Sequence, residues 1–262
     1  MSDQTATVLT ERRGAILVVT INRPAVKNAV DAATAQAIEA AMDRLDEDES
    51  LFIGVITGAG GVFSAGADLR AAQAQMESGQ PRQVLRRGGF GVFKRPPRKP
   101  IIAAVEGYAV GGGIELALAC DMIVAAETAR FGLPEVRHNV IATGGGLFRL
   151  PRRIPYNIAM EMALSGAPRD AASLERWGLI NRLVPEGEAL DQAIALAESL
   201  LVNGPTALAA SKEIIFQSAS WATEEEAWAK QVPIAEVAMR AEDRREGVAA
   251  FLERRKPVWK GR

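Results

Sequence analysis

The sequence predicts an α/β fold in which helices cover a largely parallel sheet, followed by a helical C-terminal region. Short apolar runs rich in β-branched residues alternate with stretches of helical periodicity. The runs are apolar at nearly every position, which is typical of strands covered on both faces. After residue 203 no such run recurs, and only helical patterns remain.

Four runs are expected to form buried strands, at residues 16–22, 51–57, 101–105 and 122–126. Two helices are indicated by apolar residues that recur three or four positions apart. The first has Ala35, Ile38, Met42 and Leu45 on one face, and the second has Leu190, Ile194, Ala197 and Leu201. Asp31 is suited to cap the start of the first helix.

The C-terminal part differs in character from the rest. We place a core at residues 1–200 and a helical region at residues 201–262, with helices expected at 206–216, 224–230 and 243–254. Pro233 is expected to interrupt the pattern, because proline breaks helix interiors. A helical arm of this kind packs either on another subunit or on its own core, and the sequence leaves both open.

Composition excludes several classes of protein. The 262 residues carry a formal charge of −1, which provides no long-range attraction to nucleic acid or anionic lipid. One Cys and one His exclude an internal disulfide, a CxxC site and a zinc site built from several histidines. No apolar run approaches the ~20 residues of a membrane span. We therefore expect a cytoplasmic protein without a membrane segment.

Residues 71–99 are basic and less regular than their surroundings. No acidic residue occurs between Glu77 and Glu106. The favoured interpretation is a solvated, mobile surface segment, and the alternative is a rim that attracts a phosphorylated ligand. The basic residues are Arg82, Arg86, Arg87, Lys94, Arg95, Arg98 and Lys99.

The glycine-rich segments do not match the common nucleotide-binding or hydrolase motifs. The GxGxxG pattern fails at Phe63 in one segment and at Leu116 in another, and no GxxxxGK or GxSxG motif occurs. Two glycine-rich turns nevertheless follow predicted strands, at residues 63–69 and 107–116. Bare backbone N–H groups from two such turns could together hold one oxyanion.

Two acidic residues lie at these or neighbouring turns. Glu115 is surrounded by apolar residues three positions after Gly112, so it either complements the start of a helix or serves as a buried functional carboxyl. Glu135 follows Pro134, a pair that commonly opens a short helix, so a structural role is favoured when it is considered alone.

Several motifs in order resemble the crotonase (enoyl-CoA hydratase/isomerase) superfamily. They are GAGGVFSAGADL, KPIIAAVEGYAVGGGIELALACDMIVA and ARFGLPE, and the likeness extends from Asn22 to the closing AFLERRKPVWKGR. The resemblance implies a spiral of ββα units and a C-terminal helical region used to assemble a homotrimer or a dimer of trimers. It also implies an acyl-CoA substrate and no separate cofactor or metal.

The resemblance further implies roles for particular residues. The Ala67 and Gly112 N–H groups would form an oxyanion hole, with Glu115 and Glu135 as the two catalytic glutamates of the hydratase branch. We assign Glu115 mainly to water activation and Glu135 mainly to proton exchange at the α-carbon. Further positions similar to those that contact substrate in the family are Val26, Lys27, Ala65, Asp68, Leu69, Arg70, Gly111 and Thr143.

Some features depart from plain enoyl-CoA hydratases. Ala142 and Thr143 replace a Pro and a Gly usual in the family, in a stretch that lines the acyl side. The ending PVWKGR and the stretch RWGLINR resemble the carnitinyl-CoA dehydratase branch. The expected activity is addition or removal of water across the α,β-double bond of an acyl-CoA. The alternatives are a double-bond isomerase or related crotonase reaction and, less favoured, a non-catalytic CoA- or RNA-binding protein.

Overall fold

The computed structural model describes residues 6–81 and 83–262, and its main feature is a six-stranded sheet in the order β1-β2-β3-β4-β6-β9. The first strand pairs antiparallel with the second, and all other pairs in this sheet are parallel. Each of the four predicted runs coincides with or overlaps one of its strands. The strands are β1 (Val8–Arg13), β2 (Ile16–Ile21), β3 (Ile53–Gly58), β4 (Ile101–Val105), β6 (Met122–Ala126) and β9 (Arg182–Val184).

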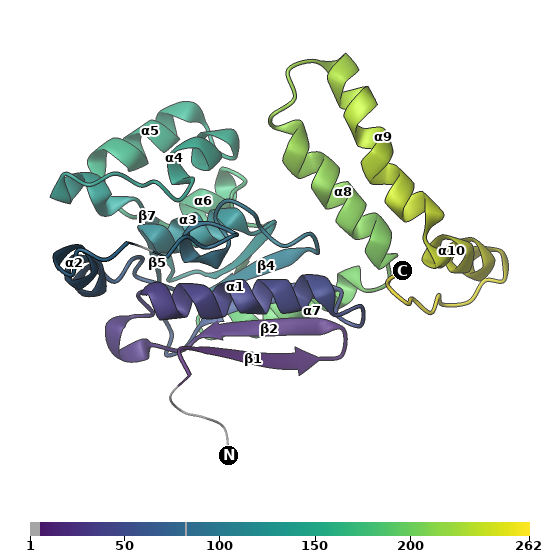
Figure 1. The fold of residues 1–262 in the computed structure, drawn as a ribbon, viewed down its shortest axis with the longest axis horizontal. Helices are drawn as coiled ribbons and strands as arrows, with labels where there is room; N and C mark the ends of the chain where they lie inside the picture. Colours follow the sequence, from purple (N-terminus) through teal and green to yellow (C-terminus); the bar gives the residue numbers. More distant parts are fainter. Residues whose placement is uncertain (1–5, 82) are drawn as a thin grey trace.

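Two helices cover the opposite faces of this sheet, as the apolar runs predict (Figure 1). Side chains alternate along a strand, so Leu17 and Val19 join the core under α1 (Ala32–Glu47). Ile16 and Val18 join the second core under α7 (Ala189–Leu200). The predicted cap is confirmed, because Asp31 accepts a hydrogen bond from the Thr34 N–H at 2.8 Å.

A second, three-stranded sheet consists of strands too short to stand out in the sequence. It contains β5 (Tyr108–Val110), β7 (Arg130–Gly132) and β8 (Arg169–Asp170) in that order. The chain passes from β4 through β5 into α3 (Gly112–Ala119), and from β6 through β7 into a short 3₁₀ helix, η3 (Pro134–His138). Because β5 and β7 pair in parallel, with Val110 opposite Gly132, the turns that follow them lie side by side.

The remaining helices surround this core or extend from it. Those near the core are α2 (Leu69–Glu77), α4 (Gly146–Arg149), α5 (Tyr156–Ser165), α6 (Ala171–Arg176) and the 3₁₀ helices η1 (Pro24–Val26), η2 (Gly89–Gly91) and η4 (Leu150–Arg152). The C-terminal helices α8 (Pro205–Ser218), α9 (Glu224–Arg240) and α10 (Glu242–Leu252) stand to one side of it (Figure 1).

The expected interruption at Pro233 is wrong, because α9 continues through it. Proline removes one backbone hydrogen bond from a helix interior. No described residue of α9 is buried, so water can bond the freed carbonyl and the cost is reduced. Within the described ranges no single helix is long and apolar enough to cross a membrane; the bent pair of α7 and α8 passes this test by length and composition alone.

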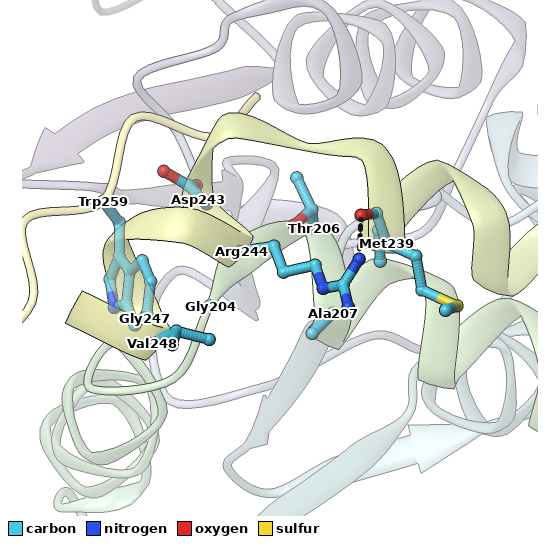
Figure 2. Close-up of a pocket in the computed structure, with 10 residues that line it drawn as sticks. Gly204, Thr206, Ala207, Met239, Asp243, Arg244, Gly247, Val248 and Trp259 are labelled. Carbon is cyan, nitrogen blue, oxygen red and sulfur yellow. Dashed lines mark hydrogen bonds between the residues drawn. The ribbon is translucent and has the colours of Figure 1, made fainter. Parts of the chain in front are cut away.

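The C-terminal tail folds back onto α8 and α10 and lines an open cavity of about 380 Å³ (Figure 2). Trp259 lines this cavity with Gly204 and Gly247, and its Nε1 donates to the Val202 carbonyl at 3.2 Å. The buried Asp243 carboxylate accepts the Lys260 and Gly261 N–H groups, each at 2.8 Å. These contacts hold the tail in place, and neither glutamate implied by the family resemblance lines this cavity.

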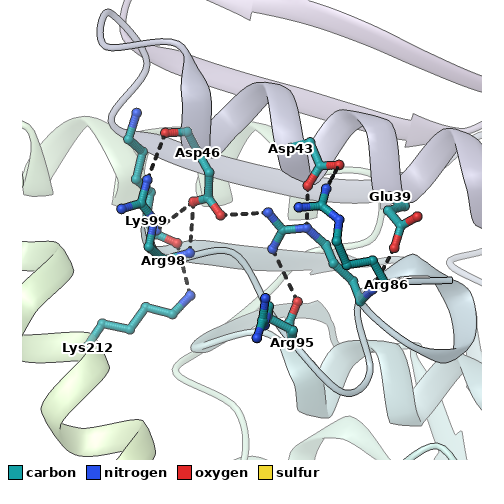
Figure 3. A network of polar contacts seen from close by, with 9 residues as sticks. Glu39, Asp43, Asp46, Arg86, Arg95, Arg98, Lys99 and Lys212 are labelled. Carbon is teal, nitrogen blue, oxygen red and sulfur yellow. Dashed lines mark hydrogen bonds and ion pairs between the residues drawn. The ribbon is translucent and has the colours of Figure 1, made fainter.

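The basic segment before β4 is fastened to α1 rather than free in solvent (Figure 3). Arg87, only 5% exposed, donates to Asp43 and Asp46 at 2.7 Å each. Its backbone N–H donates to Glu39, and the Arg98 N–H donates to Asp46. The interpretation of this segment as solvated and mobile is therefore wrong around Arg87, because acidic residues more than 40 positions earlier in the chain neutralise it. Arg82 lies outside the described residues.

Candidate active site

Glu115 lies in the first turn of α3 but does not cap it. Every residue of this helix is buried, and Glu115 is 4% exposed. Its Oε1 accepts a hydrogen bond from the Gly146 N–H at 2.9 Å, across 31 residues of chain. The carboxyl thus bonds the first residue of α4 and not the free N–H groups of its own helix, so it makes no capping bond in α3 and is a buried carboxyl with few polar partners.

Glu135 reaches the same region from η3. Its Oε1 would lie 3.3 Å from a Cβ atom placed on Gly111, the residue just before α3. Its Oε2 is buried and has no hydrogen-bond partner among the described residues. A buried carboxylate oxygen without a partner is costly, so such a group is typical of a site that binds a ligand or transfers a proton.

The two carboxyls influence each other electrostatically. Burial raises the pKa of Glu115, the charge of Glu135 raises this pKa further, and the Gly146 N–H opposes the shift. Burial likewise raises the pKa of Glu135. Two neighbouring carboxyls with raised pKa values favour a state in which one is protonated and the other ionised, which suits paired acid and base chemistry.

The two glycine-rich turns adjoin each other at this site. A Cβ atom on Gly66 would lie 3.0 Å from the Gly112 N and 2.8 Å from the Val110 carbonyl oxygen, so only glycine permits this approach. Val30 holds the turn at Gly66 with two hydrogen bonds. Its N–H donates to the Gly66 carbonyl, and its own carbonyl accepts from the Asp68 N–H. In the described part of the chain, the Ala67 and Gly112 N–H groups have no hydrogen-bond acceptor.

Two aromatic residues that the sequence analysis did not single out line the same region. The Phe90 ring packs against Gly112, and its backbone has a left-handed φ of 54°. It stacks on Phe93 with ring centroids 4.7 Å apart. A Cβ atom on Gly144 would meet both the Phe93 ring and Glu115 Oε2. The aromatic pair therefore lies between the amide-bearing turn and the carboxyl.

The chain is similar to known proteins over nearly its whole length. The sequence profile of the enoyl-CoA hydratase/isomerase family matches residues 11–262. The chain belongs to the enoyl-CoA hydratase/isomerase family. This confirms the resemblance noted in the sequence, and the solved structures described next confirm the predicted crotonase-type α/β fold with its C-terminal helices.

Relatives within the family are named either as carnitinyl-CoA dehydratases or hydratases, or as enoyl-CoA hydratases. Carnitinyl-CoA dehydratase from Salmonella enteritidis is 42% identical, over 96% of this chain and 97% of that protein. A crystal structure of a probable enoyl-CoA hydratase/isomerase from Mycobacterium abscessus is 50% identical, with a TM-score of 0.92 and full coverage of both chains. A carnitinyl-CoA hydratase from Mycobacterium avium is 40% identical, with a TM-score of 0.75, over 98% of this chain and 99% of that chain.

The residues of this chain that are expected to contact CoA lie on the two loops around Lys27 and Ala67. The Lys27 carbonyl accepts the Ala65 N–H at 2.9 Å, which joins the two loops. Asp68 caps α2 by accepting the Ala71 N–H at 3.1 Å and pairs with Arg23 at 3.0 Å, so its carboxylate is held within the chain. The other expected residues of these loops and of the 139–146 stretch are exposed at the surface: Val26, Leu69, Arg70 and Thr143.

Proposed function

We propose that the protein is a hydro-lyase that adds or removes water across the α,β-double bond of an acyl-CoA thioester. The observation that carries this proposal is a pair of carboxyls beside two unbonded N–H groups on adjoining turns: Glu115, which is buried, and Glu135, which is half-buried with its Oε2 buried and unbonded. An isomerase that shifts a double bond needs one group to exchange protons, whereas hydration needs one carboxyl for water and one for the α-carbon. The retention of two favours water chemistry.

In the proposed mechanism, the thioester oxygen accepts hydrogen bonds from the Ala67 and Gly112 N–H groups. Negative charge develops on this oxygen when a nucleophile adds at the β-carbon, and one such donor typically lowers the barrier by about 3–4 kcal/mol. Ionised Glu115 takes a proton from water as the water oxygen bonds to the β-carbon. Protonated Glu135 donates to the α-carbon, and elimination reverses these steps. The pair titrates as a unit, so the roles describe one protonation state of the dyad.

Substrate contacts are proposed for the loops next to the Ala67 turn. Gly111 and Thr143 would border the acyl group, since Gly111 adjoins Glu135 and Thr143 precedes the Gly144–Gly146 loop. The CoA portion would lie along the surface loops, contacting Val26, Lys27, Ala65, Asp68, Leu69 and Arg70. The substrate carries its own activating thioester, so the mechanism requires no further cofactor.

We also propose a cytoplasmic homotrimer or dimer of trimers, assembled through the helical region at residues 201–262. Large apolar side chains on the C-terminal helices are exposed, with Phe251 82% and Ile215 72% accessible. Such surface is typical of an interface between subunits. Light scattering coupled to size-exclusion chromatography tests this, and a monomer would contradict it. The RNA-binding alternative is less favoured because Arg86 and Arg87, two of the basic residues on which it rests, are paired with Asp43.

The test of function is a panel of thioesters: crotonyl-CoA, crotonobetainyl-CoA, a 3-enoyl-CoA and longer 2-enoyl-CoAs. We expect hydration of 2-enoyl thioesters and a large loss of rate in Glu135→Gln. Activity on crotonobetainyl-CoA distinguishes a carnitinyl-CoA dehydratase from a plain enoyl-CoA hydratase, the two activities for which the relatives are named. Isomerisation of the 3-enoyl-CoA without hydration would contradict the proposal, and so would a Glu135→Gln variant that hydrates at the wild-type rate.

A further inference from the structure

Arg149, the last residue of α4, is a half-buried cation next to the candidate site. Its Nη1 donates to the Gly144 carbonyl at 3.3 Å, and its Nη2 donates to the Phe93 carbonyl at 2.5 Å. In the described ranges it forms no ion pair within 4.0 Å of a carboxylate. An arginine removed from water is ordinarily paired with an acid, whereas the partners of Arg149 are two backbone carbonyls and the Phe148 ring, whose centroid lies 5.5 Å from the guanidinium carbon.

The groups that Arg149 bonds are the ones that surround Glu115. Gly144 begins the short loop whose Gly146 N–H donates to Glu115 Oε1. Phe93 approaches Glu115 from the segment that is fastened to α1. One guanidinium therefore joins two segments, distant in sequence, that form two sides of the Glu115 pocket.

The charges around Glu115 have opposite effects. Glu135, on η3, opposes its ionisation, while Arg149, on α4, favours it. Arg149 itself faces further cations, Arg152 and Arg153, and the buried Cys120 thiol on the side of α3. Burial lowers the pKa of Arg149, and the Glu115 carboxylate is a charge that favours its protonated form. The Glu115 and Arg149 side chains thus each favour the charged form of the other, although they share no direct bond.

We propose that Arg149 is a positioning residue, which holds the Gly144–Gly146 loop and the Phe93 segment around Glu115 and supplies the positive charge that stabilises the Glu115 carboxylate. The inference builds on the proposed function, since it explains how the base of that mechanism stays ionised beside Glu135. A planar guanidinium suits the role because it can donate to two carbonyls in different directions.

The test uses Arg149→Met and Arg149→Lys, with Arg152→Met as the matched control, because Arg152 is an exposed cation nearby. The first readout needs no activity: carboxyl-¹³C glutamate NMR, with the Glu115 signal assigned by its loss in Glu115→Gln. We expect Glu115 to titrate at higher pH in Arg149→Met than in wild type and Arg152→Met. An unshifted Glu115 titration would overturn the inference, even where the wild-type enzyme proves to have another activity.

The second readout is the pH dependence of crotonyl-CoA hydration. We expect kcat of Arg149→Met to fall roughly 10- to 100-fold with little change in KM, and its acid limb to move to higher pH. Arg149→Lys keeps the positive charge but cannot donate to both carbonyls as the planar guanidinium does. We therefore expect the acid limb of its pH profile to stay in place while kcat falls. If the Met variant does not fold, the Lys variant decides, and wild-type kcat in Arg149→Lys would overturn the positioning role. Failure of wild type to hydrate any 2-enoyl-CoA would instead reject the proposed function.

Discussion

The substitution Gly66→Ala tests whether the two amide-bearing turns must adjoin. Gly66 has a φ of +94°, which costs an L-residue about 1–3 kcal/mol. The added Cβ would also lie 2.8 Å from the Val110 carbonyl oxygen and 3.0 Å from the Gly112 N. Both are backbone atoms that no side-chain rotation can move aside. Relief therefore requires the turns to separate, which displaces the Ala67 N–H from the Gly112 N–H.

Loss of one oxyanion donor raises the barrier by about 2.7–4 kcal/mol, so kcat for crotonyl-CoA hydration should fall about 10²- to 10³-fold. Gly61→Ala is the control, because Gly61 also has a positive φ, +72°, but nothing lies within 4 Å of its added Cβ. Gly61→Ala should lose about 1–2 kcal/mol of stability, because alanine is also strained at a positive φ, and should keep the wild-type kcat. Initial rates and chemical unfolding are measured on both variants. Equal kcat values for folded Gly66→Ala and Gly61→Ala would refute the reasoning.

Three further predictions follow from the site and its support. Glu115→Gln should lower kcat about 10²- to 10⁴-fold. Glu115→Gln should also raise the melting temperature at neutral pH. Burial raises the pKa of Glu115 in the folded state, so the folded protein loses stability as pH rises and this carboxyl ionises, whereas a glutamine stays neutral. In melting scans at different pH values, the advantage of the Gln variant should vanish near pH 4.5. Arg87→Met should cost about 1.5–3 kcal/mol in urea unfolding, because it removes the buried guanidinium that bonds both Asp43 and Asp46. The exposed Arg86→Met should cost at most about 1 kcal/mol, and similar losses for the two variants would contradict the anchoring role. Phe90→Ala should improve kcat/KM for longer 2-enoyl-CoAs relative to crotonyl-CoA by about tenfold. Phe148→Ala, on the exposed side of α4, is the control. The same ratio of kcat/KM values in the two variants would contradict this prediction.

The elements that could be predicted from sequence are those with a strong local pattern. The four apolar runs form strands because both faces of the sheet are covered, and the helix after Asp31 begins where its capping residue predicts. The strands β5, β7 and β8 could not be predicted, because two or three residues carry no periodicity and depend on pairing across the fold. Helix α2 was missed as well, because its residues fall in the stretch that was interpreted as irregular surface, and none of them is buried.

The candidate site was predicted in part. The glycine-rich turns and Glu115 stand out locally, because a carboxyl among apolar residues is unusual. The contributions of Phe90, Phe93 and Arg149 could not be predicted, since each depends on contact with segments more than 20 residues away. The same limit explains the error at Arg87: its neutralising acids lie on α1, so the local run of basic residues misleads.

The most direct test of the central claim is an experimental structure with an unreactive acyl-CoA thioester bound. The account predicts that the thioester oxygen lies about 2.7–3.1 Å from both the Ala67 N and the Gly112 N. It also predicts that the Glu115 and Glu135 carboxyls flank the carbons next to the carbonyl. A thioester oxygen that contacts neither amide, or a carboxyl directed to bulk solvent in the complex, would contradict it.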